Sequence, residues 1–274
     1  MTLFLYVAVF IFGTIIGSFL NVLILRRGTG RSVVKDRSAC WTCGKMLRWY
    51  ELVPIVSYGV LRGKCARCKA SVSPQYPIVE FLTGTLFTLG AWSMIDMFFL
   101  PVWGIVSLAL LLAVIISLSV MMTVYDIRHT IIPNAWVYIF AVSSLVYTAV
   151  SHLATYGTFV QWSVWDMMAG PILAIPFAAL WFFSKGKAMG LGDAKLALGI
   201  GWLLGLMEGL SAIILGFWIG AIISVGLISM HKAKGLFGTG KRFTMKSEIP
   251  FGPFLLLGMF VVFFFHIQAL YLFV

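Results

Sequence analysis

Long apolar runs alternate with short polar segments along the whole chain. A bilayer core of about 30 Å takes roughly 20 apolar helical residues. The pattern predicts about eight membrane spans, at residues 3–25, 77–94, 98–125, 135–150, 167–183, 194–206, 210–229 and 251–274. The predicted fold class is therefore an all-α polytopic membrane protein with one sizeable polar loop, between the first two spans.

Composition supports this reading. Hydrophobic residues make up 61% of the chain, charged residues 11%, and the mean hydropathy is +1.01. These values exclude an ordinary soluble domain. The first apolar run lacks a basic leading segment and a small-residue cleavage site, so it is predicted to be a retained span rather than a signal peptide. We expect three parts: a first helix at 1–25, a loop domain at 26–75 and a multi-helix membrane domain at 76–274.

The net charge of +11 has an uneven distribution. The Lys and Arg residues fall in the segments that follow the first, third, fifth and seventh predicted spans, with Lys195 at the border of the sixth span, and the alternate connections contain none. The positive-inside rule places these basic segments in the cytoplasm and both termini outside. Basic loops beside a bilayer set topology and contact anionic lipid. The expected partner of this charge is therefore membrane lipid and not nucleic acid.

Four cysteines form Cys40-x-x-Cys43 and, after 21 intervening residues, Cys65-x-x-Cys68. Paired motifs of this kind suit a tetrahedral zinc site with four thiolate ligands. Two disulfides, a redox pair and a metal-free loop are the alternatives. The predicted cytoplasmic location argues against disulfides, because thiols stay reduced there. A site with all four ligands from protein has no open position, so we expect structural Zn²⁺ in this cytoplasmic loop domain.

Asp126 and Asp193 stand at the ends of long apolar runs, where ionisable groups are expensive and are functional candidates. Both border predicted cytoplasmic segments, so they can approach one another. Gly190 and Gly192 precede the second aspartate and permit close backbone approach. Two carboxyl groups a few ångströms apart share a proton, and such a dyad activates water for attack on an amide.

Other polar residues carry weaker signals. An interfacial acid paired with Arg128 or Lys195 is the alternative for either aspartate. Asn21 in the first span and Glu80 in the second are each either a hydrogen-bond partner between helices or a substrate contact. His129 lies one helical turn from the first aspartate and could tune it.

Glycine patterns need separate interpretation. Gly13-x-x-x-Gly17 and Gly216-x-x-x-Gly220 are most simply faces where helices pack closely. Residues 235–241 match the spacing of a phosphate-binding loop, but Arg242 occupies the position of the magnesium-binding Ser or Thr. We interpret that segment as a basic loop.

The chain resembles the type IV prepilin peptidase family nearly from end to end. Gly-x-Gly-Asp alone is shared with presenilin-like proteases, but the order and spacing of the motifs together are specific. The segments that carry the resemblance are Gly17-Ser-Phe-Leu-Asn21-Val, the paired Cys-x-x-Cys loop, Pro77-Ile-Val-Glu80-Phe, Asp126 with Ile132-Pro133-Asn134, Gly190-Leu-Gly-Asp193-Ala-Lys195 and Ile249-Pro-Phe-Gly-Pro253.

This resemblance implies an aspartyl endopeptidase of the bacterial inner membrane, with Asp126 and Asp193 as its catalytic residues. Its substrates would be type IV pilin, pseudopilin or competence pilin precursors, cut after a glycine at the cytoplasmic face. Members with the tetracysteine domain often also methylate the new amino terminus with S-adenosylmethionine, and here that activity rests on resemblance alone. The expected supporting residues are Gly190, Gly192, Lys195, Glu80 and Asn21.

Two other classes of protein are open at this stage. In a transporter or channel, the intramembrane acids would relay protons or cations, but the paired glycines and the cysteine loop would have no evident purpose. In a non-enzymatic scaffold, the metal-binding loop would dock a partner. Cleavage of a pilin precursor separates the peptidase from both.

Overall fold

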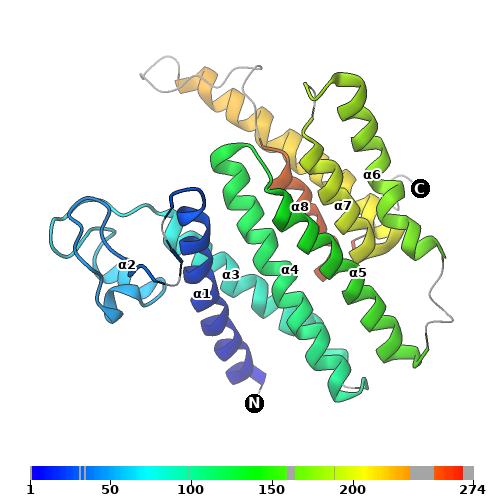
Figure 1. Ribbon diagram of the computed structural model, residues 1–274, viewed down its shortest axis with the longest axis horizontal. Helices are drawn as coiled ribbons and strands as arrows, with labels where there is room; N and C mark the ends of the chain where they lie inside the picture. The colour runs from blue at the N-terminus through cyan, green and yellow to red at the C-terminus, as the bar shows by residue number, and fades with distance from the viewer. Residues whose placement is uncertain are drawn as a thin grey trace. The chain divides into compact units, whose positions relative to one another are not determined.

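The computed structural model describes residues 2–30, 32–33, 35–97, 99–158, 164–187, 189–234 and 250–267. The described residues form helices joined by turns, with two isolated β-bridges in the cysteine loop, so the all-α prediction is confirmed (Figure 1). The helices are α1 (Thr2–Arg26), η1 (Trp49–Leu52), α2 (Val56–Val60), α3 (Gln75–Ser93), η2 (Ile95–Met97), α4 (Val102–His129), α5 (Asn134–Tyr156), α6 (Val164–Ser184), α7 (Leu191–Lys234) and α8 (Gly252–Phe265).

The chain divides into two compact units, Met1–Phe99 and Leu100–Val274. The first unit holds α1, the cysteine loop and α3, and the second holds α4 to α8. The predicted three-part division at residues 25 and 75 stays a prediction about sequence segments.

In the first unit, α1 and α3 pack antiparallel through small residues. A β-carbon on Gly13 would lie 2.8 Å from the α-carbon of Gly84, and one on Gly17 would lie 2.9 Å from the α-carbon of Glu80. Side chains at these glycines would force the helices apart. The close-packing role predicted for the first glycine pair is confirmed.

In the second unit, α4 and α5 form an antiparallel pair with a short link. Thr130 ends α4 in the left-handed conformation, at φ 53°, and its N–H donates to the Asp126 carbonyl at 2.7 Å. Pro133 then precedes the first residue of α5, a position that suits its fixed φ and missing N–H. The helices meet again at their other ends, where a β-carbon on Gly104 would lie 2.8 Å from that of Ala154.

The long helix α7 is a hairpin of two arms. Gly205 has φ 77° and ψ −176°, a backbone conformation open essentially to glycine alone. The chain reverses direction at this residue. The two arms are in contact on either side of it, since a β-carbon on Gly209 would lie 3.4 Å from the α-carbon of Gly201. Next to the break, the Thr148 hydroxyl of α5 donates to the Trp202 carbonyl at 2.6 Å.

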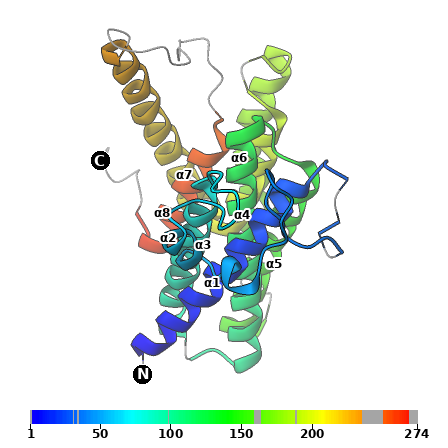
Figure 2. The ribbon, with the colours of Figure 1, turned by 90° about the vertical axis from the view of Figure 1, so that its left-hand side faces the viewer.

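The second arm of α7 packs against the start of α8. Gly216 and Gly220 both face Phe254, so the close-packing role predicted for this glycine pair is also confirmed. Beyond that contact the arm continues past the first turn of α8 (Figure 2).

Five helices among the described residues are long and apolar enough to cross a membrane: α1, α4, α5, α6 and α7. This is fewer than the eight predicted spans for physical reasons. The predicted spans 194–206 and 210–229 are the two arms of α7, and α3 contains Glu80 and three threonines. The last predicted span corresponds to α8, and residues 268–274, like the 235–241 segment, lie outside the described residues.

Candidate active site and metal centre

Asp126 lies in the last turn of α4, on the side of the helix that faces the bundle. Its residue is 5% exposed. The left-handed cap at Thr130 ends the helix one turn later, which stops α4 at the end of the bundle rather than beyond it. The sequence therefore places a carboxyl group at the buried edge of an apolar helix.

Asp193 lies in the first turn of α7 and is 8% exposed. Its N–H donates to the Gly190 carbonyl at 3.2 Å, and its carboxylate accepts a hydrogen bond from the Gly190 N–H. An acidic side chain in a first helical turn is favoured by the helix dipole and by the free N–H groups there.

The two aspartates meet at one end of the second unit. The first residue of α8, Gly252, directs its N–H to the carboxylate of Asp126. Ile132 lies next to this contact, with its side chain 3.0 Å from a β-carbon on Gly252 and 3.1 Å from one on Gly192. Asp126 and Asp193 interact electrostatically across this small group. The predicted approach of the two acids is thus what the structure shows.

Lys195 does not pair with either acid. Its Nζ donates to Asn134 Oδ1 at 2.7 Å and lies 4.9 Å from the centre of the Tyr138 ring. It therefore joins the first turns of α7 and α5. Among the described residues neither Asp126 nor Asp193 forms an ion pair, so the alternative of a simple interfacial salt bridge finds no support there.

Asn21 and Glu80 lie in the first unit. Asn21 is fully buried, donates to the Tyr76 carbonyl at 3.3 Å and accepts from Gln75 Nε2 at 3.1 Å. Glu80 Oε2 accepts from the N–H of Ile55 at 2.7 Å. Both residues thus act as internal partners, Asn21 between two helices and Glu80 between α3 and the cysteine loop.

Gly252 and Ile132 are site residues that our sequence analysis did not single out. Both stood inside segments that carry the family resemblance, but neither has chemistry that attracts attention. Their importance is steric, and only the packing of α8 against the end of α4 makes it visible. His129, considered as a tuning group, packs its ring against that of Tyr125, with centroids 4.4 Å apart and the planes tilted by 36°.

The four cysteines form a cluster that could hold a metal ion. Their sulfur atoms all lie within 4.8 Å of one another, and all four are free thiols, which agrees with the argument against disulfides. Backbone N–H groups of Cys43 and Thr42 point at the Cys40 sulfur and lower the pKa of that thiol to about 6. The N–H groups of Cys68 and Arg67 likewise lower the pKa of Cys65. Such donors stabilise thiolates, the form that binds metal.

The two Cys-x-x-Cys turns have the same backbone construction. In each turn the backbone carbonyl of the first cysteine accepts a hydrogen bond from the N–H four residues later. The donor is Gly44 in one turn, at 2.9 Å, and Lys69 in the other, at 3.0 Å. Both of these residues have positive φ, 68° at Gly44 and 59° at Lys69. One turn therefore uses glycine where the other tolerates a lysine in the left-handed region, which costs a non-glycine residue about 1–2 kcal/mol.

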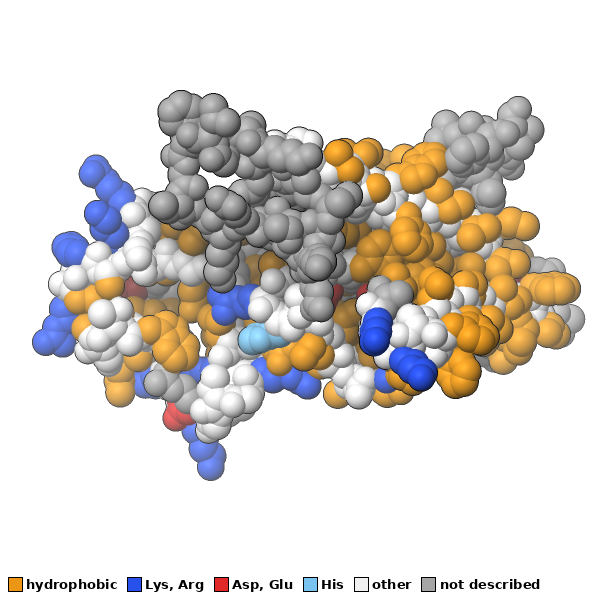
Figure 3. Space-filling view, turned by 90° about the horizontal axis from the view of Figure 1, so that it is seen from above, with side chains coloured by type: hydrophobic (Ala, Val, Ile, Leu, Met, Phe, Trp, Pro, Cys, Tyr) orange, Lys and Arg blue, Asp and Glu red, His pale blue; other side chains and the backbone are white. Residues whose placement is uncertain are grey.

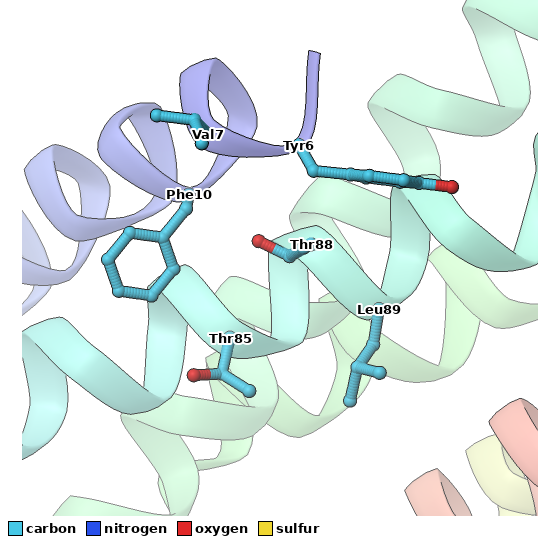
Figure 4. A pocket seen from close by; sticks show the side chains of 6 residues that line it. All are labelled: Tyr6, Val7, Phe10, Thr85, Thr88 and Leu89. Carbon is cyan, nitrogen blue, oxygen red and sulfur yellow. The ribbon is translucent and has the colours of Figure 1, made fainter. Parts of the chain in front are cut away.

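An apolar groove of about 310 Å³ lies between α1 and α3 (Figure 4). Phe10 and Val7 of α1 face Thr85, Thr88 and Leu89 of α3 across it. The threonine hydroxyls already donate to carbonyls of their own helix, at 2.9 Å each. The groove therefore offers no free acid or base and is not a candidate active site.

The fold and the site define a class: a multi-pass membrane protein with two buried, interacting carboxyl groups at one end of a helix bundle and a loop whose four clustered cysteines could hold a metal ion. Two family models match the chain, the Bacterial Peptidase A24 N-terminal domain over residues 11–94 and the Type IV leader peptidase family over residues 113–225. The chain belongs to the type IV leader peptidase family, so the resemblance seen in its motifs is confirmed.

Three relatives carry the name prepilin leader peptidase/N-methyltransferase. The protein from Neisseria gonorrhoeae is 31% identical over 273 residues, 88% of each chain. The one from Stutzerimonas stutzeri is 28% identical over 276 residues, covering 89% of this chain and 85% of the relative. The one from Myxococcus xanthus is 47% identical over 81 residues, 30% of this chain and 24% of that protein. No solved structure matches this chain.

Proposed function

We propose that this protein is a membrane aspartyl endopeptidase that removes leader peptides from prepilin-type precursors, with Asp126 and Asp193 as the catalytic pair. The observation that carries the proposal is the meeting of these two buried carboxyl groups, 67 residues apart in sequence, at one end of the second unit. The names of the relatives support the same substrate class.

In the proposed reaction one carboxyl group is ionised and the other protonated, because two like charges so close do not both ionise. The ionised carboxylate takes a proton from water, which attacks the carbonyl carbon of the scissile amide. The protonated carboxyl donates to the carbonyl oxygen. The C–N bond then breaks as the tetrahedral intermediate collapses. The proton taken from water passes to the departing amine nitrogen, and the hydroxyl proton of the intermediate returns to the carboxylate that donated it. One water is thereby added across the C–N bond.

The N–H groups of Gly252 and Gly190 have a positioning role in this reaction. Each donates to one of the two carboxylates, so each holds an acceptor oxygen at the start of a helix. Lys195 fixes the turn that carries Asp193 through its hydrogen bond to Asn134. The pair is therefore held by backbone and by neighbouring helices before substrate arrives.

We assign the cut to the cytoplasmic face of a bacterial inner membrane, after a glycine of a type IV pilin, pseudopilin or competence pilin precursor. The charge pattern supports this topology, because Arg128, Lys185 and Lys187 belong to the segments that border the two aspartates. Labelling of single introduced cysteines from each side should place these segments in the cytoplasm. Labelling of the Asp126 and Asp193 ends from opposite sides would refute the dyad.

We assign Zn²⁺ as the ion of the cysteine cluster. Zn–S bonds of about 2.3 Å place the sulfur atoms of a tetrahedral site about 3.8 Å apart. The Cys40 and Cys68 sulfurs are 3.8 Å apart, and all four sulfurs lie within 4.8 Å of one another, which is close to that spacing. With Cys43 and Cys65 as the other ligands the ion has no open position, and it would hold the loop together without taking part in the reaction.

A second activity, methylation of the new amino terminus with S-adenosylmethionine, is supported by the relatives' names alone. The groove between α1 and α3 does not fit this cofactor, because adenosine and a charged amino-acid moiety need polar partners and the groove is apolar. We place the methyl-donor site at the cysteine loop with the ends of α1 and α3. Mass spectrometry of processed pilin with the donor supplied tests this, and a fully cleaved but unmethylated product refutes it.

The decisive experiment is cleavage of a purified pilin precursor by reconstituted protein. Asp126→Asn and Asp193→Asn should each abolish cleavage while expression and membrane insertion stay near wild type. Asp166→Asn is the matched control, since Asp166 lies in the first turn of α6, outside the dyad, and cleavage should be unchanged. Near-normal cleavage by either dyad variant would refute the assignment, and so would pilin left intact by the wild type.

A further inference from the structure

A small lobe of the cysteine loop exposes large apolar side chains. This lobe, residues 48–64, contains η1 and α2, which pack on each other. Trp49 is 79% exposed and Val60 is 76% exposed. Val56 is also exposed and lies one helical turn before Val60, so both valines point from the same side of α2. An apolar patch of this kind marks a surface that meets something other than water.

The same lobe is positively charged and presents no acid. Glu51 is the one acidic residue in the sequence between Cys40 and Pro74, and its side chain is 2% exposed. Its two oxygens are taken by Lys45 Nζ at 2.8 Å and by the N–H of Arg48 at 2.7 Å. The acid is therefore turned inward and does not offset the basic surface.

Basic and aromatic side chains are interleaved on the lobe. The Arg48 guanidinium donates to the Tyr50 hydroxyl at 2.8 Å and lies 5.9 Å from the centre of that ring. Arg62 and Lys64 follow α2 directly and are exposed. At the left of Figure 3, where the cysteine loop lies, blue Lys and Arg side chains and orange hydrophobic ones are both exposed. Mixed aromatic and basic surfaces of this composition suit the headgroup layer of an anionic bilayer.

Contacts with α3 place the lobe beside the membrane helices, at the level expected for the lipid headgroups. Ile55, between η1 and α2, is bonded through its N–H to Glu80, the sixth residue of α3. At about 1.5 Å per residue, this contact lies several ångströms inside the start of the helix. Glu80 also packs against Gly17 of α1, a candidate membrane span, well before that helix ends at Arg26. The lobe is therefore fixed beside the membrane helices and not beyond their ends.

We propose that the lobe at residues 48–64 is a lipid-binding surface, with Trp49, Val56 and Val60 in the boundary between headgroups and acyl chains. Arg48 and Arg62 would contact the phosphates of anionic phospholipids. The partner is the bilayer that holds α1, since the loop that carries the lobe follows this helix and the lobe is bonded to α3, which packs on α1. Charge complementarity favours this occupant over a protein, and it gives the basic loop a function beyond topology.

Hydrogen exchange of the full-length, zinc-loaded protein in nanodiscs tests the proposal. Amides of residues 48–64 should exchange at least about tenfold more slowly in discs of phosphatidylcholine and phosphatidylglycerol than in phosphatidylcholine alone, since the basic residues are attracted to an anionic surface. The Arg48→Gln/Arg62→Gln variant should lose this difference. The Trp49→Ser/Val60→Ser variant should exchange faster in both lipids.

The matched control is Lys35→Gln/Arg37→Gln, which removes two basic residues that precede the first cysteine, outside the lobe. It should keep the lipid-dependent protection. Zinc content near one ion per chain in every variant shows that the loop is folded. Equal exchange in both lipids would overturn the proposal. Protection that appears only when a second protein is added would also overturn it and would mark a protein-docking surface.

Discussion

A methyl group on the α-carbon of Gly252 would lie 2.8 Å from Oδ2 of Asp126. The start of α8 therefore presses directly on one of the two buried carboxyl groups. Ile132 closes the other side of the same space, 3.0 Å from that methyl position. No larger residue fits at position 252 unless the carboxylate or the helix moves.

Gly252→Ala should consequently lower pilin cleavage by about tenfold to a hundredfold, because a shift of about 1 Å in a catalytic group costs that much. The protein should remain inserted and folded. Gly226→Ala is the control, since a β-carbon there would meet nothing within 4 Å. Equal activity of the two variants would show that the contact with Asp126 has no role in catalysis.

The two aspartates should act as one unit. If each single Asn variant loses at least about a thousandfold in rate, the double variant should lose little more, because both residues serve the same proton transfer. Single-turnover cleavage with purified protein measures this. Rate losses that multiply in the double variant would mean that Asp126 and Asp193 have independent roles.

The cysteine cluster should carry about one zinc per chain. Replacing any one of Cys40, Cys43, Cys65 and Cys68 with Ser should lower the metal content and loosen the loop, while cleavage falls only as far as the protein unfolds. Elemental analysis of purified variants measures the first effect and limited proteolysis the second. A metal-free wild type with a fully protected loop would contradict the assignment.

The positive φ at Gly44 and Lys69 makes a sharper test of the same site. Gly44→Ala should speed zinc loss to a chelator, because an alanine there costs about 1–2 kcal/mol in the left-handed region. Lys69→Gly should slow it or leave it unchanged, since it removes that cost in the second turn. Unchanged zinc loss from Gly44→Ala, or faster loss from Lys69→Gly, would show that the left-handed residues do not have the same role in the two turns.

The break at Gly205 should be sensitive to any side chain. Its φ and ψ are essentially restricted to glycine, and strain of this kind costs about 1–3 kcal/mol. Gly205→Ala should lower the thermal midpoint in detergent, whereas Gly226→Ala in the second arm of the same helix should not. An unchanged midpoint for Gly205→Ala would mean that α7 does not need this turn.

Acid should weaken the lobe at residues 48–64. The Arg48 N–H and the Lys45 ammonium hold the pKa of Glu51 below its usual range. A lowered pKa in the folded state gives stability that is present above about pH 4.3 and is lost as the pH falls through the folded value. Glu51→Gln should therefore exchange faster than wild type at neutral pH, with the difference vanishing in acid. A constant difference at all pH values would exclude ionisation as its source.

Local sequence alone determined several parts of this protein. Runs of apolar residues predicted the helices, since a chain in lipid must satisfy its backbone hydrogen bonds internally. The spacing of Cys40, Cys43, Cys65 and Cys68 predicted their clustering, because each pair lies within a single turn. The prediction that Asp126 and Asp193 share one face followed from counting spans and from the charge pattern.

The tertiary structure decided what depends on contacts between distant segments. It bonded Glu80 to Ile55 and placed Gly252 and Ile132 against the aspartates. It also turned two predicted spans into one hairpin at Gly205. Glu80 was a candidate hydrogen-bond partner from sequence, but its partner was not. Gly205, Gly252 and Ile132 carry no local signal for their roles, because glycine and isoleucine act here through the space they leave or fill. Such space exists only once α4, α7 and α8 are packed together, and packing is a property of the assembled helices rather than of any one of them.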